Sequence, residues 1–160
     1  MVTERLRRWL PLLAALIWAG VIFSFSSIVS SNLPDTPIWE ALRNPSLDAP
    51  SLPDAPSLAA VPDPDVAMWE WITRKGAHIL TFGVLGFLVA AAAAALQLPR
   101  PGLTGWVVAT LYGAVDEAHQ AFVPGRTAQA TDVLIDAIGA LLGVTLWWYL
   151  ARRGRRPIVR

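Results

Sequence analysis

The sequence predicts an all-α integral membrane protein built as a four-helix bundle, and three observations support this class. First, 54% of the 160 residues are hydrophobic and only 16% are charged, whereas soluble domains are about 25% charged. Second, four apolar segments approach the roughly 20 residues that a membrane-spanning helix requires. Third, arginines gather at both ends of the chain and in one short turn, a distribution typical of cytoplasmic segments.

The four predicted spans cover about residues 9–29, 77–98, 103–123 and 133–150. The first predicted span follows a basic N-terminal segment, as the apolar core of a signal peptide does. Its apolar run is longer than a signal-peptide core of about 7 to 15 residues, and no distinct small-residue cleavage site follows it. We therefore interpret it as a span, and we expect a single membrane domain over residues 1–160.

The arginines predict the orientation of the spans. Arg5, Arg7 and Arg8 precede the first span, Arg100 lies in the turn between the second and third spans, and an arginine cluster follows the fourth. Lys and Arg are enriched in cytoplasmic loops, so we predict that both termini are cytoplasmic.

Residues 31–68, between the first two spans, are rich in proline and in acidic side chains. Closely spaced prolines oppose helix formation and favour extended, solvated chain. The predicted orientation places this segment outside the cytoplasm. We expect a flexible, proline-rich extracytoplasmic loop here.

Small residues predict close packing of the spans. Gly83 and Gly86 lie in the second span, and Gly139 and Gly143 form a G-x-x-x-G pattern in the fourth. Lipid gives helices no hydrophobic reason to associate, so small residues that let backbones approach one another mark the helix contacts. A compact bundle is the expected result.

Polar residues from three spans converge, in this topology, just below the extracytoplasmic surface. The second and fourth spans begin there, and the third ends there. A charged side chain in hydrocarbon costs roughly 2.5 to 3.5 kcal/mol on insertion scales, so these groups must be paired, hydrated or functional. The set comprises Lys75, His78, Asp116, Glu117, Gln120, Arg126, Asp132 and Asp136.

Within this set, we assign ligand binding to five residues and leave structural roles open for some of them. Lys75 can also anchor its helix by reaching the headgroups, and Asp116 and Asp132 can serve as structural ion-pair partners of Lys75 or Arg126. Pro124-Gly125 suits a type II turn that would aim the Arg126 guanidinium at a carboxylate or phosphate. The five are Lys75, Gln120, Arg126, Asp132 and Asp136.

A catalytic hypothesis is that His78 and either Asp116 or Glu117 form a general acid/base pair. The alternative for His78 is a neutral core histidine bonded to a carboxylate. Imidazole and carboxylates from His78, Asp116, Glu117 and Asp132 also suit a divalent metal. No helix carries a recognised metal-ligand spacing, so we predict no metal. We also predict no cofactor and no nucleic-acid partner.

The ordered motifs resemble the VanZ-like family of small polytopic bacterial membrane proteins. They are Lys75-x-x-His78, then Asp116-Glu117-x-x-Gln120 leading into Pro124-Gly125-Arg126, then Asp132 to Gly143. The family usually has asparagine where this chain has Asp136, and a buried carboxyl there can be held protonated. The resemblance implies a multi-pass protein of the bacterial inner membrane. The family's founding member is associated with resistance to the lipoglycopeptide teicoplanin.

Three functions follow as hypotheses. The first is a binding protein whose outer pocket holds a lipid headgroup, a lipid-linked cell-wall precursor or a lipoglycopeptide. The second is a membrane-embedded hydrolase or transferase that acts on a lipid-linked substrate through a His/carboxylate pair. The third is a scaffold in which the polar residues only lock three helices together.

Overall fold

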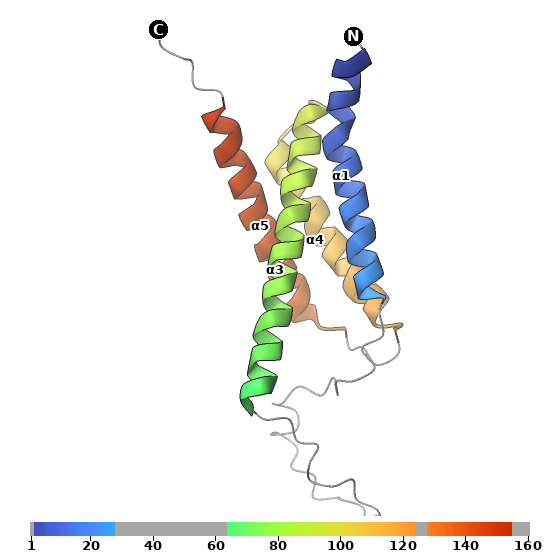
Figure 1. The fold of residues 1–160 in the computed structure, drawn as a ribbon, viewed down its shortest axis with the longest axis vertical. Coiled ribbons are helices and arrows are strands. Elements are labelled where there is room, and N and C mark those ends of the chain that lie inside the picture. Colours follow the sequence, from blue (N-terminus) through green and yellow to red (C-terminus); the bar gives the residue numbers. More distant parts are fainter. Residues whose placement is uncertain (1, 28–63, 124–127, 155–160) are drawn as a thin grey trace, which may run out of the picture.

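The computed structural model describes residues 2–27, 64–123 and 128–154, and this part of the chain is all-α. It contains α1 (Val2–Ser26), α3 (Pro64–Ala95), α4 (Pro101–Gln120) and α5 (Ala130–Arg153). The four helices form one bundle in which neighbours along the chain run in opposite directions, so that the two termini lie at the same end (Figure 1). The predicted four-helix bundle is confirmed.

Helix α3 is the centre of the bundle. It packs against α1, α4 and α5, whereas α1 contacts α4 only slightly. The core is small: Ile22 from α1, Phe82 and Leu85 from α3, Ala109 from α4 and Ala140 from α5. Many large apolar side chains point outwards instead, as expected of helices whose solvent is lipid.

Three helices are long and apolar enough to cross a membrane, over Arg7–Ser26, Trp71–Ala95 and Ala130–Arg153. The chain is therefore a membrane protein. Helix α4 has 20 residues and is about 30 Å long at 1.5 Å per residue. Its polar final turns lower its average hydropathy, so its passage across the membrane stays a prediction.

The helix ends differ from the sequence-based boundaries. Helix α3 begins at Pro64, well before residue 77, so residues 64–68 of the expected loop are helical. Proline is accepted in a first helical turn because its missing N–H would have no partner there. The rest of the expected loop that precedes Pro64, over residues 31–63, lies outside the described residues.

Glycines bring α3 and α5 into backbone contact, as the G-x-x-x-G pattern predicts. A Cβ on Gly143 would overlap the carbonyl oxygen of Gly83, and one on Gly139 would lie 2.5 Å from the carbonyl oxygen of Ile79. A Cβ on Gly86 would lie 2.7 Å from the carbonyl oxygen of Ala140. The interface therefore admits no side chain at these positions.

Two hydrogen bonds to backbone carbonyls attach α1 to the rest of the bundle. The indole N–H of Trp18 donates to the carbonyl of Thr81 at 2.9 Å. The hydroxyl of Tyr112 donates to the carbonyl of Ala19 at 2.7 Å. Both place the C-terminal half of α1 against α3 and α4, beside the polar residues described below.

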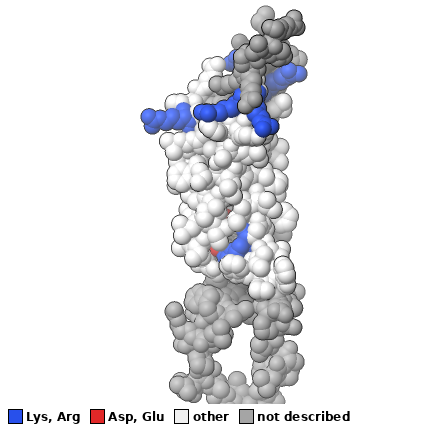
Figure 2. Space-filling view, turned by 90° about the vertical axis from the view of Figure 1, so that its left-hand side faces the viewer, with Lys and Arg blue, Asp and Glu red and all other residues white. Residues whose placement is uncertain are grey.

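Basic side chains gather at the end of the bundle that carries both termini (Figure 2). The exposed arginines described at this end are Arg7, Arg8, Arg100, Arg152 and Arg153. Two of them cover aromatic rings: the Arg152 guanidinium lies 3.6 Å from the centre of the Trp148 ring, and that of Arg153 lies 4.3 Å from the centre of the Tyr149 ring.

Candidate functional site

The polar residues lie towards the opposite end of the bundle, where α4 ends and α5 begins beside residues 75–78 of α3. The alternating helix directions bring these three segments together, although they are far apart in the sequence (Figure 1). His78 is half-buried in this polar cluster. Its other members are buried: Lys75, Asp116, Glu117, Gln120, Asp132 and Asp136.

An ion pair joins α3 to α5. The ammonium of Lys75 donates to Asp132 Oδ1, and both side chains are 10% exposed. Asp132 lies in the first turn of α5, whose N-cap residue is Gln129, so the carboxylate also interacts favourably with the helix dipole. The ion-pair role that the sequence left open for Asp132 is the one observed.

A second link between α3 and α5 involves His78 and Asp136. His78 Nδ1 lies 2.9 Å from Asp136 Oδ1, and Asp136 is completely buried. Gly113 of α4 makes room for this carboxyl, because a Cβ there would lie 2.9 Å from Asp136 Oδ2. The carboxylate partner of His78 is thus Asp136, not Asp116 or Glu117, which the catalytic hypothesis named.

Glu117 and Asp116 are adjacent in sequence but have different partners. Glu117 Oε2 accepts a hydrogen bond from the backbone N–H of Gln129 at 2.8 Å, which ties the end of α4 to the start of α5. Asp116 Oδ2 accepts one from the Gln120 amide at 2.9 Å. The other oxygens of both carboxylates are buried and have no hydrogen-bond partner among the described residues.

His119 takes part in a different contact. Its Nε2 lies 3.2 Å from Ser27 Oγ, and its ring centre lies 4.6 Å from that of Phe23. Phe23 lies in the last turn of α1, and Ser27 directly follows the helix. These contacts indicate a structural role for His119 in holding α1 against α4.

A pocket of about 390 Å³ opens between α1 and the polar cluster. His78, Asp116 and Gln120 contribute polar groups to it, and Ser26 adds a buried hydroxyl with no partner among the described residues. The remaining lining is mostly apolar. It consists of Trp18, Val21, Ile22, Phe25, Ala77, Thr81 and Phe82.

Sequence patterns do not indicate that the aromatic residues of α1 line this pocket. Trp18 and Phe25 look like ordinary lipid-facing residues of a span. The pairing of α1 with α3, which the sequence does not reveal, puts these side chains opposite His78.

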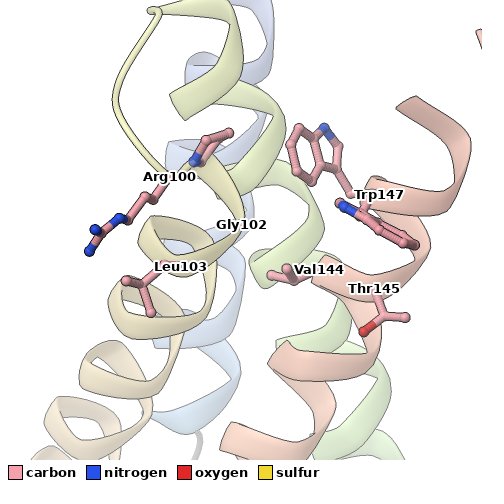
Figure 3. Close-up of a pocket in the computed structure, with 8 residues that line it drawn as sticks. Arg100, Gly102, Leu103, Val144, Thr145 and Trp147 are labelled. Atoms are coloured by element: carbon pink, nitrogen blue, oxygen red, sulfur yellow. The ribbon is translucent and has the colours of Figure 1, made fainter. Parts of the chain in front are cut away.

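A second hollow, of about 510 Å³, lies at the basic end between the start of α4 and the end of α5 (Figure 3). Arg100 is its one ionisable lining residue, and in Figure 3 its guanidinium points away from Trp147. The other labelled lining residues, among them Leu103 and Val144, are mostly apolar. This hollow has the character of a lipid-facing groove and is separate from the polar cluster.

Three residues of the polar cluster have the arrangement of metal ligands. His78, Glu117 and Asp132 each offer one ligand atom, and these atoms all lie within 4.8 Å of one another. They belong to α3, α4 and α5. No spacing along one helix could therefore have indicated them.

Arg126 and the predicted Pro124-Gly125 turn lie outside the described residues. The assigned roles of the other site residues stay predictions.

The family model for VanZ/LLP1 matches residues 11–152. Comparison with curated proteins and with solved structures gives no match. The matched region includes most of the chain and every described member of the polar cluster. The resemblance carried by the motifs is confirmed: this chain belongs to the VanZ/LLP1 family.

Proposed function

We propose that this VanZ/LLP1 protein binds a lipid-linked molecule of the bacterial cell envelope in the pocket between α1 and the polar cluster. One observation carries the proposal: the pocket joins an apolar wall to a group of buried polar side chains. Ligand sites commonly combine a mostly apolar lining with a few polar groups that orient the ligand.

The two kinds of lining suit the two parts of an amphiphile. An acyl or prenyl chain packs against Trp18, Phe25 and Phe82, while the polar head meets His78, Asp116 and Gln120. Ala77 and Phe25 are exposed on the outer surface of the bundle. A lipid can therefore reach the pocket sideways from the bilayer, without passing through water.

The arginine distribution supports an extracytoplasmic pocket. Described arginines other than Arg74 cluster at the end with both termini (Figure 2), and Lys and Arg favour the cytoplasmic side. The polar cluster then lies near the outer leaflet of the bacterial inner membrane. Candidate ligands share a long apolar chain and a polar head: a lipid headgroup, a lipid-linked cell-wall precursor, or a lipoglycopeptide such as teicoplanin.

A pocket-filling substitution tests the proposal. Ala77→Trp places a large ring in the pocket, and Ala118→Trp is the matched control on an exposed position of α4 outside its lining. Native mass spectrometry of the detergent-purified full chain measures binding of undecaprenyl phosphate and, in a second arm, teicoplanin. Vancomycin, which has no acyl chain, is the control ligand.

We expect Ala77→Trp to weaken binding about tenfold or more, a change of about 1.4 kcal/mol, while Ala118→Trp binds like the wild type. The arm that responds identifies the ligand class. Equal binding by both variants, or no binding of either amphiphile by the wild type, contradicts the proposal.

A second candidate function, a hydrolase or transferase that acts on a lipid-linked substrate, rests on the His78–Asp136 contact. A carboxylate bonded to one imidazole nitrogen orients the other as a general base. His78 also lines the pocket, next to Asp116. Turnover of a lipid-linked precursor by the wild type but not by His78→Gln supports this function, whereas unchanged precursor in both cases removes it.

A further inference from the structure

Among the described residues, the polar cluster contains more buried acidic side chains than buried basic ones. Four of its members are carboxylates, Asp116, Glu117, Asp132 and Asp136, and among the described residues Lys75 is the one buried Lys or Arg. Burial of an ionised carboxylate is costly unless a positive charge and hydrogen bonds compensate. Three carboxylate oxygens, one each on Asp116, Glu117 and Asp136, are buried without a partner in the described part of the chain.

The geometry of His78, Glu117 and Asp132 fits a cation at one point. Their ligand atoms lie within 4.8 Å of one another. In tetrahedral geometry, ligand atoms at about 2.0–2.2 Å from a metal lie about 3.3–3.6 Å from one another. Metal binding therefore draws these three side chains closer together.

The second donor atom of each residue is already held in place. His78 Nδ1 contacts Asp136, Glu117 Oε2 accepts from the Gln129 N–H, and Asp132 Oδ1 accepts from Lys75. Metal ligands are oriented by this kind of outer contact, and a histidine ligand usually bonds a carboxylate through its other nitrogen. The remaining donors are His78 Nε2, Glu117 Oε1 and Asp132 Oδ2, of which Glu117 Oε1 is buried and unpartnered among the described residues.

We propose that His78, Glu117 and Asp132 bind one divalent first-row transition-metal ion. One imidazole and two carboxylates suit Zn²⁺ or Mn²⁺. The ion adds two positive charges where the described residues have more buried acidic side chains than buried basic ones. Three protein ligands also leave a position on the metal for water or a ligand oxygen. The proposal does not depend on the lipid-binding function, because the three ligands and their outer contacts are complete without a lipid.

Metal binding is tested on the untagged full chain in detergent, because a histidine tag binds the same ions. After chelator treatment and dialysis, isothermal titration with Zn²⁺ or Mn²⁺ alone measures stoichiometry and affinity. The variant Glu117→Gln removes one ligand charge. The matched control Asp116→Asn removes an equally buried charge from the neighbouring residue, outside the three ligands.

We expect one ion per wild-type chain, binding weakened about tenfold or more by Glu117→Gln, and near-wild-type binding by Asp116→Asn. The wild-type melting temperature rises with metal, because a ligand that binds only the folded state stabilises it. Equal losses in the two variants point to unspecific attraction to acids and overturn the proposal. If Glu117→Gln does not fold, X-ray absorption of the metal-loaded wild type decides: one imidazole with oxygen ligands supports the site, and absence of imidazole overturns it.

Discussion

At the scale of single residues, Asp136 shows how the site combines structure and chemistry. It is completely buried, contacts His78, and occupies space that exists only because residue 113 is glycine. The carboxyl therefore fixes the orientation of the imidazole beside the pocket. A residue with the same shape and an acceptor oxygen at the same place should preserve this arrangement.

We predict that Asp136→Asn retains the fold, because its amide oxygen still accepts a hydrogen bond from His78 Nδ1. Asp136→Ala instead leaves His78 without its partner and is expected to cost about 1–3 kcal/mol of folding free energy. Thermal unfolding of the two purified variants measures the difference. Equal destabilisation by asparagine and alanine would show that charge, not hydrogen bonding, holds this position.

The Lys75–Asp132 ion pair gives a second residue-scale prediction. Removal of one partner leaves a buried charge alone and costs about 3–5 kcal/mol, so Lys75→Asp should sharply reduce protein abundance in the membrane. The exchanged pair Lys75→Asp with Asp132→Lys restores the attraction. We expect restored abundance but no restored ligand binding, since the exchange reverses the positions of the positive and negative charges within the polar cluster. Recovery of both would favour the scaffold function.

At the scale of helices, the close contact of α3 with α5 brings the turn of α3 that carries Lys75 and His78 alongside the first turns of α5. Gly83, Gly139 and Gly143 allow that contact, and the Lys75 and His78 links lie towards the same end of the interface. The geometry of the polar cluster thus depends on glycines that lie outside it.

We predict that Gly143→Ala separates α3 from α5, because its Cβ would overlap the carbonyl oxygen of Gly83. Overpacking of this kind costs about 1–3 kcal/mol, and both thermal stability and ligand binding should fall. Gly20→Ala is the matched control, since nothing lies within 4 Å of a Cβ at Gly20. Equal melting temperatures for the two variants would contradict the proposed role of the contact.

Some of this helix-scale structure follows from the sequence and some does not. The apolar segments and the G-x-x-x-G pattern predict four helices and a close interface, because both signals are local. The early start of α3 at Pro64 does not follow from the sequence, because closely spaced prolines favour a loop although the first turn of a helix accepts proline. The α1 wall of the pocket depends on which helices pair, and hydropathy contains no such information.

At the scale of the whole molecule, alternating helix directions separate an arginine-rich end from a polar end (Figures 1 and 2). The sequence predicted the convergence of the polar residues, because successive spans alternate in direction. This prediction does not depend on the orientation, since a reversal moves all of these residues together. The sequence did not predict the pairing of His78 with Asp136. It named His78, Asp116, Glu117 and Asp132 as groups that suit a metal but did not separate Asp116 from the other three, because these contacts depend on rotation of each helix about its axis.

The predicted orientation can be tested with single cysteines, since the chain has none of its own. We expect a membrane-impermeant maleimide to label Asn44→Cys in intact cells, because residues 31–68 are predicted to be extracytoplasmic. Gly154→Cys, just after α5, should react only after the cells are permeabilised. The reverse pattern would place the polar cluster on the cytoplasmic side.

The central claim is that one polar cluster, built from three helices, binds an amphiphile. Its most direct test is binding of undecaprenyl phosphate and teicoplanin, per folded protein, to alanine variants of Lys75, His78, Asp116, Glu117, Gln120, Arg126 and Asp132, with membrane abundance measured in parallel. The account predicts that His78, Asp116 and Gln120 variants lose binding of the same amphiphile while their abundance stays near normal. Binding that falls only in proportion to abundance across the whole panel would contradict it.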